Sequence, residues 1–131
     1  MRTLTCSKMK AAIEQILRSY NLLEAFQAGP EFAVRIKNDP YMPLTIECHD
    51  SQITVTHYLR ENADLIPDPD MEFKRFDDNS WCPVAIQFAS GHYRRAMHGP
   101  QEFRDQIKFS ELWARNLIAQ GFCSGEAERI D

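Results

Sequence analysis

The sequence has no long hydrophobic run and no excess of basic residues. No stretch approaches the ~18–20 apolar residues of a membrane-spanning helix, so we expect no membrane span. Lys and Arg number 15 against 19 Asp and Glu, which gives a net charge of −4. This balance lacks the cations that neutralise phosphates, so we expect no direct binding to nucleic acid. Residues 1–6 contain no apolar core of a signal peptide, which predicts a cytoplasmic protein.

Closely spaced cysteines are also absent. The four cysteines, Cys6, Cys48, Cys82 and Cys123, are spread over the chain. Zinc sites normally use ligand pairs at short spacing, and no Cys-x-x-Cys occurs. Cys48 and His49 would point to opposite faces of a strand, which makes joint ligation awkward. We therefore expect free thiols, mostly buried as small apolar side chains, and neither a metal nor a cofactor.

The length of the chain fits one domain. With 131 residues, of which 44% are hydrophobic, the chain can bury a core without disulfides or a bound metal. We expect a single domain over residues 1–131.

Helical spacing of apolar residues occurs near both ends of the chain. It predicts an amphipathic helix over about 8–20 and a short second turn that ends at Ala28. A last helix is expected from about 101 or 109 to 120, with a break near Phe109–Ser110 left open. The tail from Cys123 is expected to be frayed.

Between these helices, apolar and polar residues alternate with the period of a strand. The alternation covers about 32–37, 44–48, 53–60, 71–76 and 81–89, and 92–97 is a candidate sixth strand. Successive runs are joined by short turns, which indicates an antiparallel meander. The sequence therefore predicts an α+β fold, with a sheet of about five to six strands flanked by an N-terminal and a C-terminal helix.

Acidic residues concentrate in one part of this pattern. Residues 61–80 contain seven acids and two bases, a net charge of −5, so the remainder of the chain sums to +1. We refer to residues 61–73 as the acidic segment. Its prolines, Pro67 and Pro69, cannot donate hydrogen bonds to a sheet, so we expect a loop rather than a central strand.

Three interpretations of the acidic segment remain open. Its acids could oppose a basic partner, and the candidate residues are Asp64, Asp68, Asp70 and Glu72. The same carboxylates could hold a divalent metal, but the spacing is not that of an EF-hand and no glycine supports a tight wrap. Alternatively, Asp68 and Asp70 could only stabilise turns around Pro69.

A second candidate site consists of His57, Tyr58 and Asp64. A histidine near a carboxylate could act as a general base. However, alternation places His57 on the same face as Ile53 and Val55, which favours a half-buried histidine without catalytic function. The sequence also lacks a phosphate-binding glycine loop, a nucleophile elbow and a His-Glu-x-x-His motif. A non-enzymatic protein is therefore favoured, with no catalytic residue assigned.

The second half of the chain contains several short motifs, namely His57-Tyr58, Glu61-Asn62-Ala63-Asp64, Asp68-Pro69-Asp70-Met71-Glu72-Phe73, Trp81 with Pro83, Trp113, Asn116-Leu117 and Gln120-Gly121-Phe122. With these motifs the chain resembles a family of small proteins carried by bacterial plasmids, prophages and integrative elements. Members have Gly where this chain has Ala63 and Glu where it has Asp70. The family is a domain of unknown function, so the resemblance implies a setting and a fold but no chemistry.

The sequence leads to two hypotheses of function. The first is a non-enzymatic, regulatory protein of a mobile genetic element that binds a protein partner through the acidic segment, such as an inhibitor of host nucleic-acid-handling or immune machinery. The alternative is a small enzyme or ligand-binding domain that uses His57, Tyr58 and Asp64. Homo-oligomerisation through an edge strand is left open.

Overall fold

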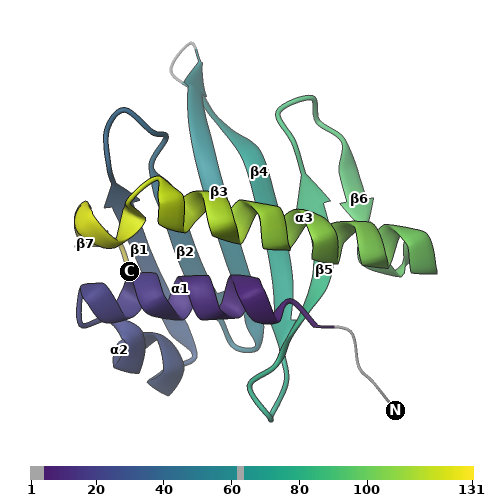
Figure 1. Ribbon diagram of the computed structural model, residues 1–131, viewed down its shortest axis with the longest axis horizontal. Helices are drawn as coiled ribbons and strands as arrows, with labels where there is room; N and C mark the ends of the chain where they lie inside the picture. Colours follow the sequence, from purple (N-terminus) through teal and green to yellow (C-terminus); the bar gives the residue numbers. More distant parts are fainter. Residues whose placement is uncertain (1–4, 62–63) are drawn as a thin grey trace.

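The computed structural model describes residues 5–61 and 64–131, and it confirms the α+β class (Figure 1). Asn62 and Ala63, which belong to one of the family motifs, lie outside the described residues. The helices are α1 (Ser7–Ser19), α2 (Leu23–Ala28) and α3 (Pro100–Ala119), with short 3₁₀ turns η1 (Ala96–His98) and η2 (Phe122–Ser124). The strands are β1 (Glu31–Lys37), β2 (Leu44–His49), β3 (Gln52–Glu61), β4 (Asp64–Arg75), β5 (Trp81–Gln87), β6 (Tyr93–Arg95) and β7 (Glu126–Arg129).

All the strands of the described chain belong to one antiparallel sheet with the order β6-β5-β4-β3-β2-β1-β7. The six strands β1 to β6 form the expected meander, in which each strand pairs with the next. The last strand, β7, returns to the far edge and pairs with β1, with Lys37 opposite Glu126. The C-terminal segment thereby extends the sheet beyond β1.

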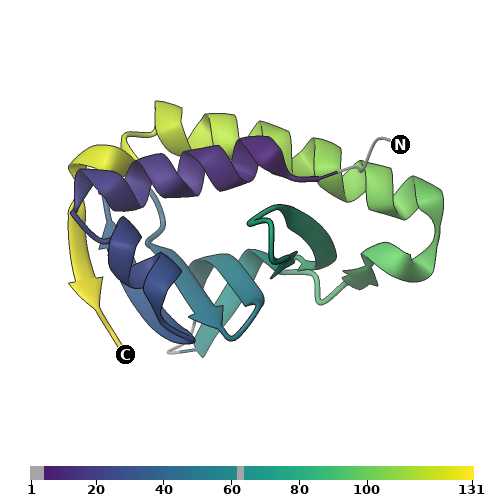
Figure 2. The ribbon, with the colours of Figure 1, turned by 90° about the horizontal axis from the view of Figure 1, so that it is seen from below.

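Helices α1 and α3 lie side by side across the strands and cover one face of the sheet (Figures 1 and 2). Apolar residues at helical spacing on α1 and at alternate positions on β1 to β4 meet between these layers. The side chains with no exposed surface there include Ile13, Ile16, Leu17, Val34, Ile36, Ile46, Val55, Met71, Phe73 and Leu117. The core therefore lies between the helices and one side of the sheet.

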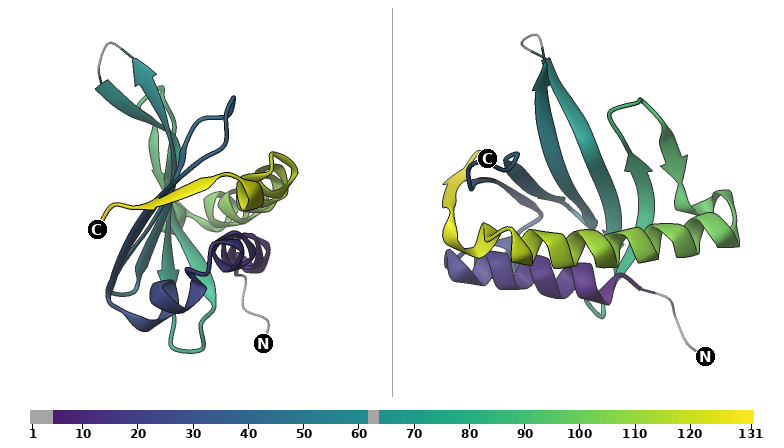
Figure 3. Two further views of the ribbon diagram at one scale, coloured as in Figure 1. Left: turned by 90° about the vertical axis from the view of Figure 1, so that its left-hand side faces the viewer. Right: turned by 45° about the horizontal axis from the view of Figure 1, so that its top comes forward.

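No helix of the described residues lies on the opposite face of the sheet, as the edge-on view in Figure 3 shows. We call it the open face. Alternation places Arg35, Thr45, Thr56 and Asp70 on it, because their neighbours along each strand point into the core. The open face is the part of the fold that a partner or ligand can reach without moving a helix.

Two expectations from the sequence were wrong in detail. The acidic segment is mostly strand β4 rather than a loop. The C-terminal tail is not frayed but forms β7, so the sheet has seven strands rather than five or six. The break near Phe109–Ser110 that was left open does not occur, because α3 is continuous from Pro100 to Ala119. The hydroxyl of Ser110 donates to the carbonyl of Ile107 within this helix (2.7 Å).

The prolines of β4 are tolerated because of their position. Strand β5 pairs with β4 only from Asp70 onward, so the N-terminal half of β4 has a single neighbour, β3. The register between β3 and β4 shifts between Thr56 and Tyr58, opposite Pro69. Prolines are accepted at such edges and irregularities, where no ladder hydrogen bond is lost.

Within 5–61 and 64–131, no helix combines the length and the apolar character needed to cross a membrane.

Candidate functional site on the open face

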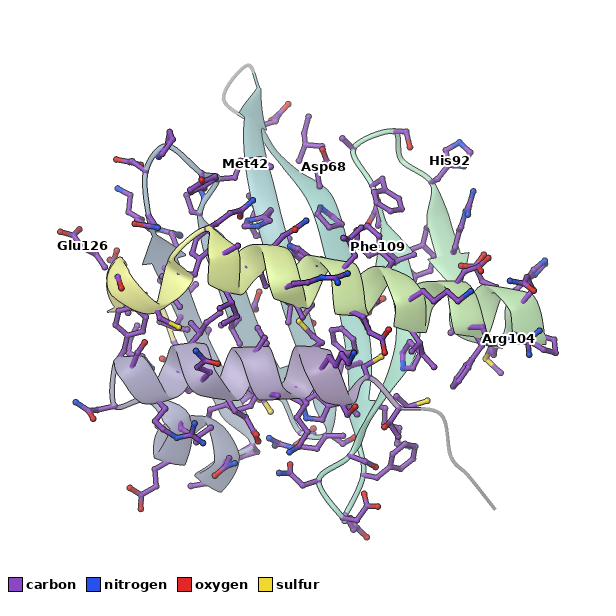
Figure 4. The ribbon with its side chains drawn as sticks, viewed as in Figure 1. Met42, Asp68, His92, Arg104, Phe109 and Glu126 are labelled. Carbon is purple, nitrogen blue, oxygen red and sulfur yellow. The ribbon has the colours of Figure 1, made fainter. Side chains whose placement is uncertain are left out.

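The acids predicted as binding residues occupy different surroundings along β4. Asp64 is exposed at the start of the strand. Asp68 lies near the loop after β5, where its Oδ1 accepts a hydrogen bond from the amide of Ala89 at 3.2 Å (Figure 4). Asp70 and Glu72 both lie on the open face, two residues apart. The structure therefore brings together Asp70 and Glu72, but not all four acids.

Glu72 is held by two neighbours on the open face. Its Oε1 accepts a hydrogen bond from Nε2 of Gln52, and its Oε2 accepts one from the hydroxyl of Tyr93, each at 2.9 Å. These contacts link β3, β4 and β6. Glu72 thus fixes the edge of the sheet in addition to supplying a charge.

Asp70 is partly buried although it lies on the open face. The hydroxyl of Thr56 donates to Oδ2 of Asp70 at 3.1 Å, and Thr56 itself has no exposed surface. Burial raises the pKa of Asp70, the hydrogen bond from Thr56 lowers it, and the nearby charges of Glu72 and Glu47 raise it. The carboxylate of Asp70 therefore lies close to two other negatively charged side chains, Glu72 and Glu47.

Tyr58 lies near Asp70 and Glu47 on the open face. Burial raises the pKa of its hydroxyl, and the charges of Glu47 and Asp70 raise it further. Glu47 on β2 is thus the acid that sequence reading missed. The alternation of residues in β2 predicted only that Glu47 faces outward. Its position in line with Glu72, with Thr54 between them, depends on the pairing of β2 with β3 and of β3 with β4. We call Glu47, Asp70 and Glu72 the acidic cluster.

The second predicted group, His57, Tyr58 and Asp64, is not brought together. His57 points into the core, with 6% of its surface exposed, and its ring packs 5.5 Å from the rings of both Trp113 and Phe122. Its Nδ1 donates to the carbonyl of Pro43 at 3.2 Å. Tyr58, the next residue, faces the open side. Burial of His57 in aromatic packing counts against a general base at this position.

The burial of His57 predicts a pH dependence of stability. Burial lowers its pKa below the usual 6.5, against the opposing effects of the Pro43 and Met42 carbonyls and of Asp68. His57 therefore binds a proton more readily in the unfolded chain than in the folded protein. The stability that its neutral, buried ring gives is complete above pH 6.5 and is lost as pH falls toward the lowered pKa. Urea unfolding of wild type and His57→Gln between pH 7.5 and 5 measures the difference.

We expect His57→Gln to lose less stability on acidification than the wild type does. The matched control is His92→Gln, which removes an exposed histidine and leaves His57 and its packing in place. Equal pH dependence in all three proteins would show that His57 does not titrate differently in the folded state.

Three of the thiols are held by burial in their less reactive, protonated form. Burial raises the pKa of Cys6 to about 12, and burial also raises the pKa values of Cys48 and Cys82. Cys6 and Cys48 are buried, whereas Cys82 and Cys123 are partly exposed, and all four are free thiols. Three or more His, Cys, Asp or Glu side chains do not converge as a metal site within the described residues.

Comparison with curated proteins and with solved structures finds no match in either set. A family model described as a domain of unknown function, DUF6908, matches residues 11–123. This range includes most of α1, all of α2, the six strands of the meander and all of α3, and therefore nearly the whole fold. The chain belongs to the DUF6908 family of domains of unknown function.

Proposed function

We propose that the protein is a non-catalytic binding protein that attaches to another protein through its open face. The supporting observation is the asymmetry of the fold: α1 and α3 cover one side of the sheet and leave the other side uncovered. Antiparallel sheets commonly keep one face polar and solvated, and such a face is accessible to a partner. The partner would contact a rigid sheet rather than a loop.

The charge of the open face indicates the chemistry of the partner. Glu47, Asp70 and Glu72 lie close enough to raise the pKa of Asp70, and the chain as a whole has a charge of −4. Complementary charge accelerates association and disfavours acidic partners. We therefore propose a partner whose contact surface is basic.

The biological setting rests on the family resemblance. The motifs resemble proteins of bacterial mobile genetic elements, so we propose that the partner is a host protein. Proteins that handle nucleic acids, including those of bacterial immunity, have basic grooves that an acidic protein can occupy. In this proposal the protein acts in the cytoplasm as an inhibitor or regulator of such a protein.

The proposal predicts that neutralising two acids of the open face weakens partner binding. The test variant combines Asp70→Asn with Glu72→Gln, which removes two charges at nearly constant size and turns one accepting oxygen of each side chain into a donating amide group. We expect roughly tenfold weaker binding, since about 1.4 kcal/mol corresponds to tenfold and each charge contributes a fraction of this. The measurement is capture of a bacterial host protein on immobilised wild type and variant at low and moderate salt.

The matched control is Glu24→Gln combined with Asp105→Asn, which removes the same charge from exposed positions on α2 and α3. The proposal requires that this control captures the same protein as the wild type does, with the same sensitivity to salt. If both double variants are folded by circular dichroism and capture the same amount of the host protein, Asp70 and Glu72 are not part of the contact with the partner.

A further inference from the structure

A cavity of about 460 Å³ lies on the open face beside the acidic cluster. Strands β1, β2 and β3 form its floor, and Ile130, just after β7, forms part of its wall. Thr45, at the floor, is 3% exposed although no helix covers it. The volume falls within the roughly 300–1,000 Å³ range of small-molecule sites.

Lys37 and Glu47 lie toward opposite ends of this cavity and carry opposite charges, and Arg35 lies between them. Arg35 and Lys37 come from β1, and Glu47 comes from β2. In the ladder Arg35 lies opposite Thr45, while Glu47 lies opposite Ala33, at the end away from Lys37. Among the described residues, no ion pair joins Glu47 to either cation.

This arrangement disfavours ligands with a single charge. An anion bound at Arg35 and Lys37 would be repelled by Glu47, and a cation bound at Glu47 would be repelled by Arg35. A ligand that carries both charges would meet an opposite charge at each end. Successive residues on one face of a strand are about 7 Å apart, a distance that these long side chains can close around one small molecule.

The remaining lining supplies apolar contact. Pro43 and Ile130 are apolar, and the ring of Tyr58 adds an aromatic wall with a hydroxyl at its end. The hydroxyl lies near Glu47, whose charge raises the pKa of Tyr58. The uncharged part of a ligand would therefore contact apolar side chains, as is common in small-molecule sites.

We propose that this cavity binds a small zwitterion, namely an α-amino acid with an apolar side chain. Its carboxylate would contact Arg35 and Lys37, its ammonium would contact Glu47 and the Tyr58 hydroxyl, and its side chain would pack against Pro43 and Ile130. The inference goes beyond the proposed function, because it depends on the cavity and not on a protein partner. Glu47 belongs to both surfaces, so a bound ligand would lie at the edge of the partner contact.

The test is a titration of the whole chain with L-leucine, followed by amide NMR shifts. Two analogues separate the charges: 4-methylpentanoate lacks the ammonium group, and 3-methylbutylamine lacks the carboxylate. We expect saturable shifts at β1, β2 and β3 with L-leucine. Each analogue should bind at least about tenfold more weakly, since it leaves one charged end of the cavity without a partner of opposite charge. L-valine, L-methionine and L-phenylalanine complete the panel.

Variants assign the two ends of the ligand. Glu47→Gln should weaken L-leucine binding by about tenfold and reduce the preference for L-leucine over 4-methylpentanoate. Arg35→Gln with Lys37→Gln should abolish the preference over 3-methylbutylamine. The control is Arg18→Gln, which removes an exposed charge on α1 and should bind L-leucine as the wild type does.

The inference is overturned if no amino acid of the panel gives saturable shifts. It is also overturned if either singly charged analogue binds as tightly as L-leucine, or if Glu47→Gln leaves binding unchanged. If the Arg35 and Lys37 variant does not fold, the analogues and Glu47→Gln still decide the outcome. None of these results depends on capture of a protein partner, so failure here is distinct from failure of the proposed function.

Discussion

Replacing Trp81 by alanine is expected to destabilise the fold by about 3–5 kcal/mol, the usual cost of deleting a large buried aromatic side chain. Trp81 has no exposed surface and packs against Phe73 and Phe26, with ring centroids 5.4 and 6.1 Å away. Its carbonyl also accepts a hydrogen bond from the amide of Cys6 at 2.8 Å, just before α1. The residue therefore joins β5, α2 and the start of α1, and urea unfolding followed by circular dichroism measures its contribution.

The loss is large relative to the whole stability of a domain, which is typically about 5–15 kcal/mol. Trp81→Ala should accordingly unfold at a much lower urea concentration, or should not fold at physiological temperature. Its backbone hydrogen bond to Cys6 is preserved, so the loss reports on the side chain.

Trp81→Phe is the informative control. The indole Nε1 of Trp81 is buried without a hydrogen-bond partner among the described residues. Burying an unpaired donor costs about 1–3 kcal/mol, so phenylalanine would remove this cost while keeping an aromatic ring. We expect Trp81→Phe to retain most of the wild-type stability. Equal losses in Trp81→Phe and Trp81→Ala would show that the indole shape, rather than aromatic burial, holds the three elements together.

The sequence predicted the main elements because their signals are local. Apolar residues on one side of α1 and alternate apolar residues in β1, β2 and β3 reflect burial against a single layer, which is visible without knowledge of the partner element. The helix boundaries agree within one or two residues, with α1 expected over 8–20 and found at Ser7–Ser19. Burial on one face of an element was sufficient for these predictions.

Features that depend on pairing between distant segments were not predictable in this way. Strand β7 has the sequence Glu-Ala-Glu-Arg and no row of apolar residues, since it is held by backbone pairing with β1 at the edge of the sheet. The strand character of Asp64–Pro69 was hidden by its prolines, which are tolerated only because β5 stops pairing at Asp70. Neither fact is a property of the local sequence.

The site residues also differ in whether their positions follow from local sequence or from pairing between distant segments. The opposite orientations of His57 and Tyr58 follow from alternation along one strand. Alternation predicted a half-buried His57, and the structure buries it more fully. The proximity of Glu47 to Asp70 and Glu72 depends instead on the registers of β2, β3 and β4. The cavity between Arg35, Glu47 and Ile130 further requires the return of the C-terminal chain to β1, where the amide of Ile130 donates to the carbonyl of Ala33 at 3.0 Å.

Replacing Gly125 by alanine tests whether close packing holds the C-terminal strand β7 against β1. Gly125 precedes β7, and a Cβ atom added there would overlap the carbonyl oxygen of Lys37 and lie 3.0 Å from its carbonyl carbon. Both atoms belong to the backbone, so the strand itself must move. We expect a loss of about 2 kcal/mol, within the range for overpacking of a well-packed site. Urea unfolding measures the loss, and amide hydrogen exchange locates it.

The hydrogen bonds around Gly125 predict where protection is lost. Its amide donates to the hydroxyl of Tyr20 at 2.7 Å, and that hydroxyl in turn donates to the carbonyl of Phe122 at 2.6 Å. Displacing Gly125 disturbs both bonds and the pairing of Lys37 with Glu126. Exchange should therefore accelerate in β7 and along the edge of β1 that faces it, while β3 and β4 keep their protection.

Gly99→Ala provides the matched control. Gly99 has an extended backbone (φ 177°), and no atom lies within 4 Å of an added Cβ. A substitution at such an open position usually changes stability by no more than about 0.5 kcal/mol. Because both variants add one methyl group to a glycine, a difference between them isolates the contact with Lys37. If Gly125→Ala matched Gly99→Ala in stability and in exchange at β1, close packing would not fix β7 against the sheet, and the wall that Ile130 gives to the cavity would not be rigid.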